Sequence, residues 1–438
     1  MMTCVKALIE KGGQDLAANW PSAGFTEWCS VDPSRATAII ESSNAGDPLA
    51  REFLSFALTA GNMVQQAVRI ADAYRDERRV RAIAALGRMN YTDLDAKIAL
   101  DALKRAIEDQ VDDILYATAL TSALGIADIA GQEVIEEVAD IVKAVCAASG
   151  PQTQYCCAYV ISANTSALNT KILSFLFGIL ASVPPELKGT LRALDNGLLK
   201  LLCSAFGDEA IAFVAKFLTD ARGTVGLADF SGFGHRLVTG PHARLHRTLV
   251  TWMLMGERTL CEGLANLVNM ARKRDLFFDL SIHDFELTAQ QKIFLCKKAI
   301  GYFFIQPVIA ASILLAILRD CDDEVATVVS DLLFDPLLIN YGGELKDYLK
   351  SIPEADPAAK PVRAALDARS QYLSGIRSTG LIRELLPSEH RRQIQRMRLQ
   401  EQSREIHKQA REQSVFHNLV HRVVLLYGRR SLTYVDHG

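Results

Sequence analysis

The sequence predicts an all-α protein, a solenoid built from successive helix pairs. Apolar residues make up 49% of the 438 residues and charged residues 23%, the balance of a folded chain with a sizeable core. Alanine and leucine dominate, whereas the alternating β-branched and polar residues that build strands are rare. Helical stretches also begin at a spacing of roughly 30–40 residues, the range of two-helix repeats.

The first 44 residues are expected to form short helices around Trp20-Pro21 that cap the N-terminal end of the repeats. Asp32-Pro33 marks the start of one helix, because aspartate caps free N–H groups and proline fits the first turn. We therefore assign residues 1–44 to an N-terminal helical cap.

Residues 45–222 are predicted to form stacked helix pairs. One pair cannot cover its own apolar faces, so each pair must pack on a neighbour. Asp47-Pro48 starts the first helix in the same way as Asp32-Pro33. The first expected pair is a helix that starts at Asp47 and a partner helix over 63–74. The next pairs are expected at 76–89 with 92–107, 112–124 with 132–148, 153–163 with 167–183, and 185–206 with 209–221.

The segment from Asp76 to Leu86, DERRVRAIAAL, resembles the second-helix pattern of HEAT repeats. In that pattern an aspartate precedes a Val-Arg pair, here Val80-Arg81, and an Ala/Leu core. The resemblance is best around residues 76–107, and it implies a HEAT- or armadillo-like solenoid. An irregular helical bundle would show the same periodicity, so that alternative stays open.

Residues 223–241 interrupt this pattern with five glycines, and we predict a glycine-rich loop there. A loop of this length inside a compact domain is usually functional or mobile. Residues 242–352 then return to apolar helical repeats. The expected helices cover 242–256, 257–274, 287–305, 307–319, 322–334 and 344–351.

The stretch from Ala299 to Leu318 runs twenty residues without a charge, which is long enough to cross a bilayer. Pro307 lies near its middle, and proline favours the first turn of a helix over its interior. We therefore predict two buried helices, one ending near Ile305 and one starting at Pro307. A kinked membrane span is the alternative, because such spans tolerate proline; a membrane partner is not expected.

Residues 353–438 are predicted to form a basic helical extension. The prolines at 353, 357 and 361 mark a domain boundary or tight corner, followed by a helix over 358–374. The run 387–414 is polar, 416–427 is strongly apolar, and 431–435 is a candidate strand. From residue 376 onward there are twelve Lys/Arg and six Asp/Glu, so this region carries +6 while the whole chain carries −3.

The cysteines and the N-terminus predict a cytoplasmic protein. Nine cysteines, an odd number without a C-x-x-C motif, indicate reduced thiols rather than a disulfide framework. The first residues lack the apolar core and cleavage pattern of a secretory signal.

The sequence contains no P-loop, G-x-S-x-G, H-E-x-x-H or G-x-G-x-x-G motif, which weakens an enzymatic interpretation. No cofactor is expected. His235, His242 and His246 could form a three-histidine zinc site, since the latter two share a helix face. Neighbouring arginines disfavour a cation and suit an anion, so the region is a candidate anion site and no metal is expected; the alternative is a solvated loop that joins two helical blocks. Its candidate residues are Arg222, His235, Arg236, His242, Arg244, His246 and Arg247.

The polar run 387–414 offers a second candidate site, because a basic helix can neutralise nucleic-acid phosphates or contact a partner. Interspersed glutamates and the lack of stacking aromatics favour a solvated helix with internal ion pairs. The candidate contact residues are Arg391, Arg392, Arg396, Arg398, Arg404, Lys408 and Arg411.

Together these features predict a non-enzymatic scaffold or adaptor that binds a protein partner on a concave helical surface, with possible self-association through the C-terminal region. The second hypothesis is a HEAT-like protein that binds nucleic acid through the basic helix and residues 222–247. The third is an enzyme subunit with a His/Arg site at 235–247. Architecture alone does not decide among them.

Overall fold

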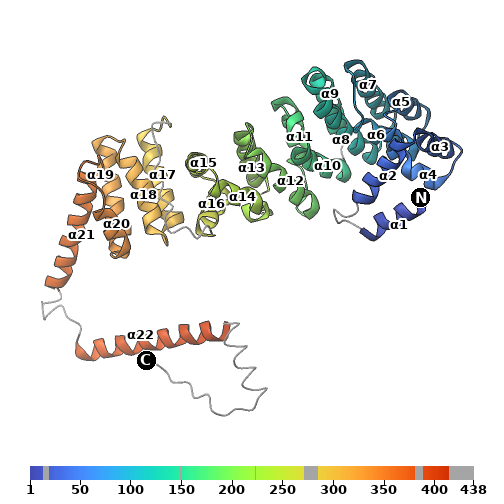
Figure 1. The fold of residues 1–438 in the computed structure, drawn as a ribbon. Helices are drawn as coiled ribbons and strands as arrows, with labels where there is room; N and C mark the ends of the chain where they lie inside the picture. Colours follow the sequence, from blue (N-terminus) through green and yellow to red (C-terminus); the bar gives the residue numbers. More distant parts are fainter. Residues whose placement is uncertain (13–18, 148–149, 222, 271–284, 380–387, 414–438) are drawn as a thin grey trace, which may run out of the picture.

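The computed structural model describes residues 1–12, 19–147, 150–221, 223–270, 285–379 and 388–413. The regular elements in these ranges are helices, with no strand among them, and the all-α prediction is confirmed. Figure 1 shows an elongated array that runs from α3 to α21, with α22 apart from it. The predicted apolar segment 416–427 and strand 431–435 lie outside the described residues.

The array has two layers, and within each layer a helix packs on its neighbours two positions away in the chain. In the first layer, contacts run from α4 through α16. Its members are α4 (Pro48–Ala60), α6 (Glu77–Leu86), α8 (Asp113–Ala130), α10 (Pro151–Ala163), α12 (Lys188–Leu201), α14 (Ser231–Thr239) and α16 (Arg258–Met270).

The second layer packs in the same way from α5 to α11 and again from α15 to α21. It consists of α5 (Val64–Ala73), α7 (Asp93–Asp109), α9 (Ile135–Cys146), α11 (Thr170–Leu180), α13 (Gly207–Asp220), α15 (His242–Met255), α17 (Ala289–Phe303), α19 (Asp323–Leu332) and α21 (Ala359–Thr379).

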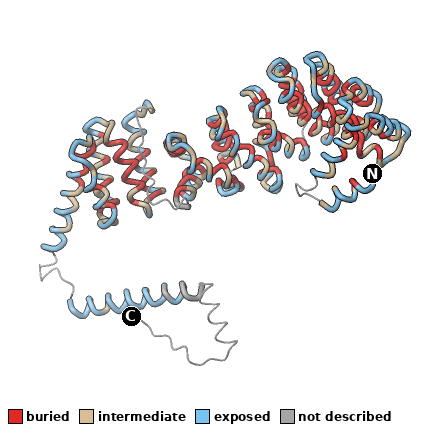
Figure 2. The backbone as a smooth tube through the Cα atoms, viewed as in Figure 1, coloured by how far each residue is buried: buried red, intermediate tan, exposed pale blue. Residues whose placement is uncertain are grey.

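These two layers share one apolar interior along the length of the array. Figure 2 shows the buried residues following the inside of the array, and the buried side chains form one cluster that spans Val5 to Ala365. Each helix pair thus completes its core with its neighbours, as expected for an α-solenoid. The helix-repeat prediction is confirmed at this level.

The remaining elements extend or close the array. α2 and α3 pack on α4, while α18 packs on α17, α19 and α20. These elements are α1 (Met2–Gly12), α2 (Asn19–Val31), α3 (Pro33–Asn44), α18 (Pro307–Leu318), α20 (Glu344–Lys350), the 3₁₀-helices η2 (Gly131–Val134), η3 (Thr165–Ala167) and η4 (Leu227–Phe230), and the π-helix η6 (Leu333–Leu338). The last helix, α22 (Glu389–Gln413), lies apart from the array.

Local sequence signals account for many helix starts. The carboxylate of Asp32 accepts from the backbone N–H of Ser34 at 3.1 Å, and that of Asp47 accepts from Leu49 at 2.9 Å. Asp76 caps α6 in the same way through Arg78 at 2.9 Å. Each satisfies an N–H group that the first helical turn leaves without a partner.

The uncharged stretch over 299–318 divides into two helices, as predicted. α17 ends at Phe303 and α18 begins at Pro307, and residues from Ile309 to Leu318 are buried. By length and composition, α8 alone among the described helices could cross a membrane, and 56% of it is buried inside the array. Both apolar segments therefore pack in the core of the array.

The domain boundary predicted at residue 353 falls before α21, although α21 still packs as part of the array. α21 packs on α19 and η6, so it continues the second layer. The corner before it is fixed by Arg319, whose guanidinium lies 3.0 Å from the carboxylate of Asp356. This carboxylate also accepts from the backbone N–H of Ala358 at 2.9 Å, which ties the turn to the start of the helix.

The glycine-rich loop predicted over 223–241 is wrong for most of its length, because η4 and α14 occupy 227–239. The carboxylate of Asp195 accepts from the backbone N–H groups of Gly232 at 2.9 Å and Phe233 at 2.8 Å. A Cβ at Gly232 would lie only 3.0 Å from that carboxylate. The glycine therefore permits a close approach between α12 and α14 instead of marking a loop.

Candidate functional site

The predicted anion-site residues are distributed over two helices of the array. His235 and Arg236 belong to α14, whereas Arg244, His246 and Arg247 belong to α15. His242 is the first residue of α15, but its side chain lies outside the description, as does the whole of Arg222. In the described parts of the chain, no three His, Cys, Asp or Glu side chains are arranged to hold a metal.

The arginines of this region contact neighbouring protein groups. Arg236 donates from Nε to the sulfur of Cys203 at 3.1 Å, and Arg244 donates to the carbonyl oxygen of Leu202. The cavity between Arg236 and Arg244 measures about 10 Å³, roughly the room that one water needs. An anion as large as phosphate would have to displace these contacts, and the anion site stays a prediction.

Arg244 and Arg247 converge instead on one carboxylate at the start of α13. Their guanidinium groups lie 3.9 Å and 3.5 Å from the carboxylate oxygens of Asp208. Arg244 is half-buried and Arg247 is exposed. The guanidinium groups of Arg244 and Arg247 therefore share the carboxylate of Asp208.

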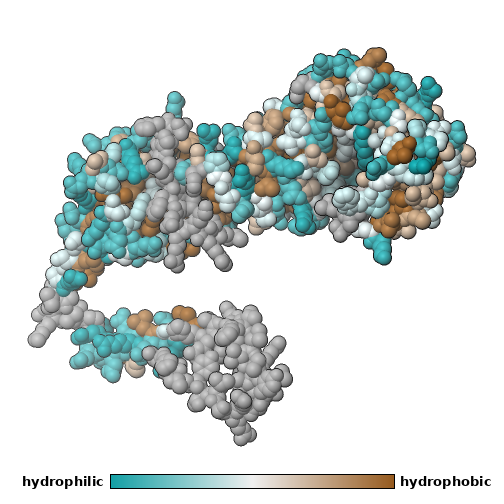
Figure 3. All heavy atoms as spheres, viewed as in Figure 1, coloured by the Kyte–Doolittle hydropathy of each residue, from teal (hydrophilic) through white to brown (hydrophobic). Residues whose placement is uncertain are grey.

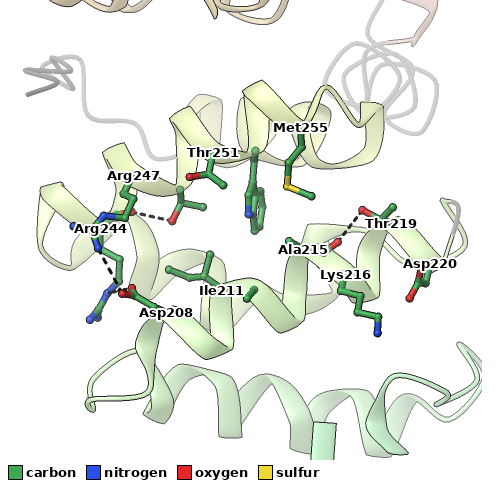
Figure 4. Close-up of a pocket in the computed structure, with 13 residues that line it drawn as sticks. Asp208, Ile211, Ala215, Lys216, Thr219, Asp220, Arg244, Arg247, Thr251 and Met255 are labelled. Atoms are coloured by element: carbon green, nitrogen blue, oxygen red, sulfur yellow. Dashed lines mark hydrogen bonds and ion pairs between the residues drawn. The ribbon is translucent and has the colours of Figure 1, made fainter. Parts of the chain in front are cut away.

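These arginines form one end of an open groove of about 500 Å³ between α13 and α15. Figure 4 shows Thr219 and Met255 between the two helices, whereas Lys216 and Asp220 extend from α13 away from α15. The groove is lined by Asp208, Ile211, Ala212, Ala215, Lys216, Thr219, Asp220, Arg244, Arg247, Thr248, Thr251, Trp252 and Met255.

The lining residues recur every three or four positions on both helices, so each helix presents one stripe to the groove. On α13 the middle of this stripe is small, with Ala212 and Ala215 where a closely packed helix would carry a larger side chain. On α15, Trp252 is only 1% exposed, whereas Met255 is 49% exposed. The groove thus has a rigid aromatic wall and an adaptable rim.

Packing on the far side of α13 helps to keep the groove open. The ring of Phe213 stacks on Phe177 of α11 with centroids 4.3 Å apart, and Phe217 meets Phe230 of η4 edge-on at 5.6 Å. α16 packs against both α13 and α15. These contacts fix the two helices separately, and the described residues of α13 and α15 do not make the extensive contacts seen between α9 and α11.

The charges in the groove lie at its ends. Asp208, Arg244 and Arg247 occupy one end, and Lys216 and Asp220 lie towards the other. Twelve helical steps separate Asp208 from Asp220, which gives a length of about 18 Å at 1.5 Å per residue. The central part offers apolar and hydroxyl groups, a composition that suits an apolar ligand with polar ends.

The sequence interpretation found Arg244 and Arg247 but missed the rest of the groove. The sequence feature that could have indicated the groove is the pair of small residues Ala212 and Ala215 near charged positions on α13. That signal could not be interpreted without knowing which helix lies opposite.

The basic candidates of the C-terminal run lie on α22, away from the groove residues in the array. Among the described side chains of this helix, Ile394 is half-buried and the others are exposed. Figure 3 shows that the visible face of α22 is mainly hydrophilic. The described basic side chains there are Arg391, Arg392, Arg396, Arg398, Arg404 and Lys408, while the side chain of Arg411 is outside the description.

The fold places the chain in the class of α-solenoids. No protein-family model matches the chain, and no curated protein is similar to it in sequence. One solved structure with a similar chain is described as a "Homology model of the full-length AP-3 complex in an intermediate open conformation". The identity is 10% over 84% of this chain and 89% of that chain, with a TM-score of 0.27.

Proposed function

We propose that this protein is a non-enzymatic scaffold that binds a partner protein by receiving an amphipathic helix in the groove between α13 and α15. The observation that carries the proposal is the groove itself, about 500 Å³ of open space with an apolar middle and charged ends. Helix-in-groove recognition uses this combination of features.

The dimensions of the groove suit a helix of about three turns. Its length of about 18 Å corresponds to roughly twelve helical residues at 1.5 Å each. Apolar side chains at every third or fourth position of such a helix would reach Ile211, Trp252 and Met255. A methionine at the rim can adjust to different side-chain shapes, which suits a surface that selects pattern and size.

The charges at the groove's ends define the expected partner more closely. Arg244 and Arg247 share the single carboxylate of Asp208, so an additional carboxylate on the partner would be attracted to this end. The partner is thus an amphipathic helix with an acidic residue about one turn from its apolar stripe. Such end charges contribute specificity and association rate more than affinity.

Synthetic helical peptides of about 16 residues, carrying a leucine stripe and a terminal glutamate, test this binding directly. We expect Ala212→Trp to fill the groove and weaken peptide binding about tenfold, or about 1.4 kcal/mol. Ala144→Trp is the matched control, because Ala144 is an exposed alanine on the second-layer helix α9. Equal affinities for the two variants, measured by isothermal titration, would remove the groove as the binding site.

The charge preference has its own test. A peptide with lysine in place of the terminal glutamate should bind the natural protein more weakly, and Arg247→Glu should reverse that order. Raising the salt concentration should shrink the difference, because the groups at the rim are exposed to solvent. If Arg247→Glu leaves the difference in affinity between the two peptides unchanged, the assigned orientation is contradicted.

A further inference from the structure

We propose that the outward face of α8 and α10 is a second binding surface, which receives an acidic amphipathic helix of a partner protein. We call this surface the tyrosine face, because Tyr155 and Tyr159 of α10 lie at its centre. It belongs to the first layer of the array, whereas the α13–α15 groove belongs to the second. The inference therefore stands or falls separately from the function proposed for the groove.

The helix α10 combines an uncharged sequence with an exposed surface. Its 13 residues, PQTQYCCAYVISA, contain no Asp, Glu, Lys or Arg. The equally uncharged α18 is almost wholly buried, whereas Tyr155 and Tyr159 of α10 are 43% and 49% exposed. The two tyrosines are four residues apart and therefore lie on one face of the helix. Tyrosine is enriched at protein interfaces, because it combines an apolar ring with a polar tip.

The helix α8 extends the uncharged surface beside these tyrosines. The carboxylate of Asp113 at its start accepts from the hydroxyl of Thr153 at 2.6 Å. Near its other end, Asp128 accepts from the side-chain amide of Asn164, so α8 and α10 lie side by side in the same direction. α8 packs on α6 and α10 along its flanks and on α7 and α9 of the second layer. Its remaining, outward side carries Ile114, which is 58% exposed.

Two threonines continue this outward side of α8 at helical spacing from Ile114. The hydroxyl of Thr118 donates to the carbonyl oxygen of Ile114 at 2.7 Å, and that of Thr121 donates to the carbonyl oxygen of Thr118 at 2.9 Å. Both hydroxyl hydrogens are thus used within α8, and the side chains offer their methyl groups to a partner. A partner that covers this part of the tyrosine face removes apolar surface from water.

A basic row on α12 borders the tyrosine face. Lys200, one residue before the end of α12, donates to the carbonyl oxygen of Ser162, one residue before the end of α10. The two helices end at the same level and pack extensively on each other, so they run in the same direction. Arg192 precedes Lys200 by eight residues and therefore lies near the level of Tyr155. Both basic side chains are exposed.

The charges around the tyrosine face favour an acidic partner. The carboxylates of Asp113 and Asp128 lie on the α8 side, where they accept hydrogen bonds from α10 and the turn that follows it. On the α12 side, a carboxylate of the partner would meet Arg192 and Lys200, whereas a basic group would be repelled. The tyrosine hydroxyls are further donors for such a carboxylate.

The spacing of these groups matches a helical partner. The tyrosines recur after four residues, and the two cations are eight residues apart, or about 12 Å along α12. A helix laid alongside α10 repeats its side chains at the same pitch, so one apolar stripe can cover the tyrosines. Two carboxylates eight residues apart on the edge of that stripe then reach both cations.

The aromatic part of the surface is tested with a synthetic helical peptide of about 16 residues, which carries a leucine stripe and two glutamates eight residues apart on its edge. We expect the full-length chain to bind this peptide, and joint replacement by Tyr155→Ala and Tyr159→Ala to weaken binding about tenfold. Tyr372→Ala is the matched control, because Tyr372 of α21 is also 43% exposed. Equal affinities of the double variant and the control, or no binding by the natural chain, would overturn the proposal.

The charge preference is tested with the same peptide carrying lysines in place of the two glutamates. The natural chain should bind the glutamate peptide about fivefold more tightly at low salt, since exposed ion pairs contribute modestly. Arg192→Glu should abolish this preference, whereas Arg377→Glu, at an exposed arginine of α21, should retain it. A preference that survives Arg192→Glu would overturn the assignment of an acidic partner.

Two further measurements separate the tyrosine face from the groove and from self-association. Ala212→Trp should leave the affinity for the two-glutamate peptide unchanged, whatever it does to peptide binding in the groove; a loss would place this peptide in the groove and overturn the proposal. With p-benzoylphenylalanine in place of Ile114, we expect a crosslink to the peptide, mapped by mass spectrometry. A crosslink to a second copy of the chain instead, or no crosslink to the bound peptide, would also overturn it.

Discussion

The junction between α6 and α8 and the junction between α13 and α15 both use small residues, with opposite results. A Cβ at Gly87 would lie 2.6 Å from the Cα of Ser122, and one at Gly125 would collide with the carbonyl oxygen of Gly87. The α6–α8 junction is therefore closed backbone to backbone. At the α13–α15 junction, the small residues Ala212 and Ala215 border about 500 Å³ of open space.

The two junctions also differ in the packing on the opposite side of the helices that form them. At the α6–α8 junction, Gly87 and Gly125 carry no Cβ, so the two backbones meet directly. α13 is anchored on its other side by Phe213 and Phe217, and it cannot close the gap that its alanines leave. Small residues thus border a direct backbone contact at one junction and an open groove at the other.

The largest expected effect comes from breaking the closed junction. Gly125→Ala should lower the free energy of unfolding by about 3 kcal/mol, because the added methyl group meets backbone that can move only with its helix. Gly178→Ala is the control, since Gly178 of α11 has open space around its Cβ position, and it should raise stability by about 0.5–1 kcal/mol. Urea denaturation followed by circular dichroism measures both. Similar effects at the two positions would contradict the close approach.

An intermediate decrease in the free energy of unfolding is expected on replacing Asp113, which links α8 to the start of α10. Its carboxylate accepts from the backbone N–H groups of Gly150 at 2.9 Å and Gln152 at 2.8 Å, and from the hydroxyl of Thr153 at 2.6 Å. Burial acts to raise the pKa of Asp113, but hydrogen bonds from Thr153 and the backbone outweigh it and hold the pKa below its usual value. Replacing this cap by Asp113→Asn should cost about 1–2 kcal/mol at neutral pH.

The pH dependence of that cost follows from the direction of the pKa shift. A carboxylate with a lowered pKa in the folded state stabilises the protein fully above its unfolded pKa of about 4. This contribution is lost as the pH falls through the lower folded value. The stability difference between the natural chain and Asp113→Asn should therefore shrink in acid, measured by urea denaturation between about pH 7 and pH 3. A constant difference across this range would argue against a titrating cap.

The features predictable from sequence were those with local causes. Aspartate caps and Pro307 act within one helical turn, so the helix starts at Pro33, Pro48 and Pro307 were correctly placed. The role of Gly232 was missed because its partner, Asp195, is 37 residues away. In sequence, a glycine that is needed for close approach to a distant carboxylate cannot be told from a glycine in a loop.

The HEAT-like segment shows the same limit on a finer scale. The pattern emphasised Arg81, but that side chain is 38% exposed and pairs with Glu77 on the same helix. Arg79 is the buried residue, 2% exposed, and it donates to the carbonyl oxygen of Ala71 at 2.9 Å while contacting Asp109 at 2.8 Å. It thereby connects α5, α6 and α7. Helical spacing identifies a face, but the neighbouring helices decide which arginine is enclosed.

The smallest expected effect on stability belongs to the open junction, and it sharpens the contrast with Gly125. Ala212 is exposed and borders empty space, so Ala212→Trp should change the free energy of unfolding by less than about 0.5 kcal/mol. The indole would fill the groove without pushing α13, because that helix is fixed by aromatic contacts on its other side. The two substitutions thus separate the junctions: added volume at the closed one should lower stability, and added volume at the open one should weaken only the proposed peptide binding. Parallel urea denaturation of both variants measures the contrast, and a destabilisation by Ala212→Trp comparable to that of Gly125→Ala would mean that α13 and α15 close together in solution.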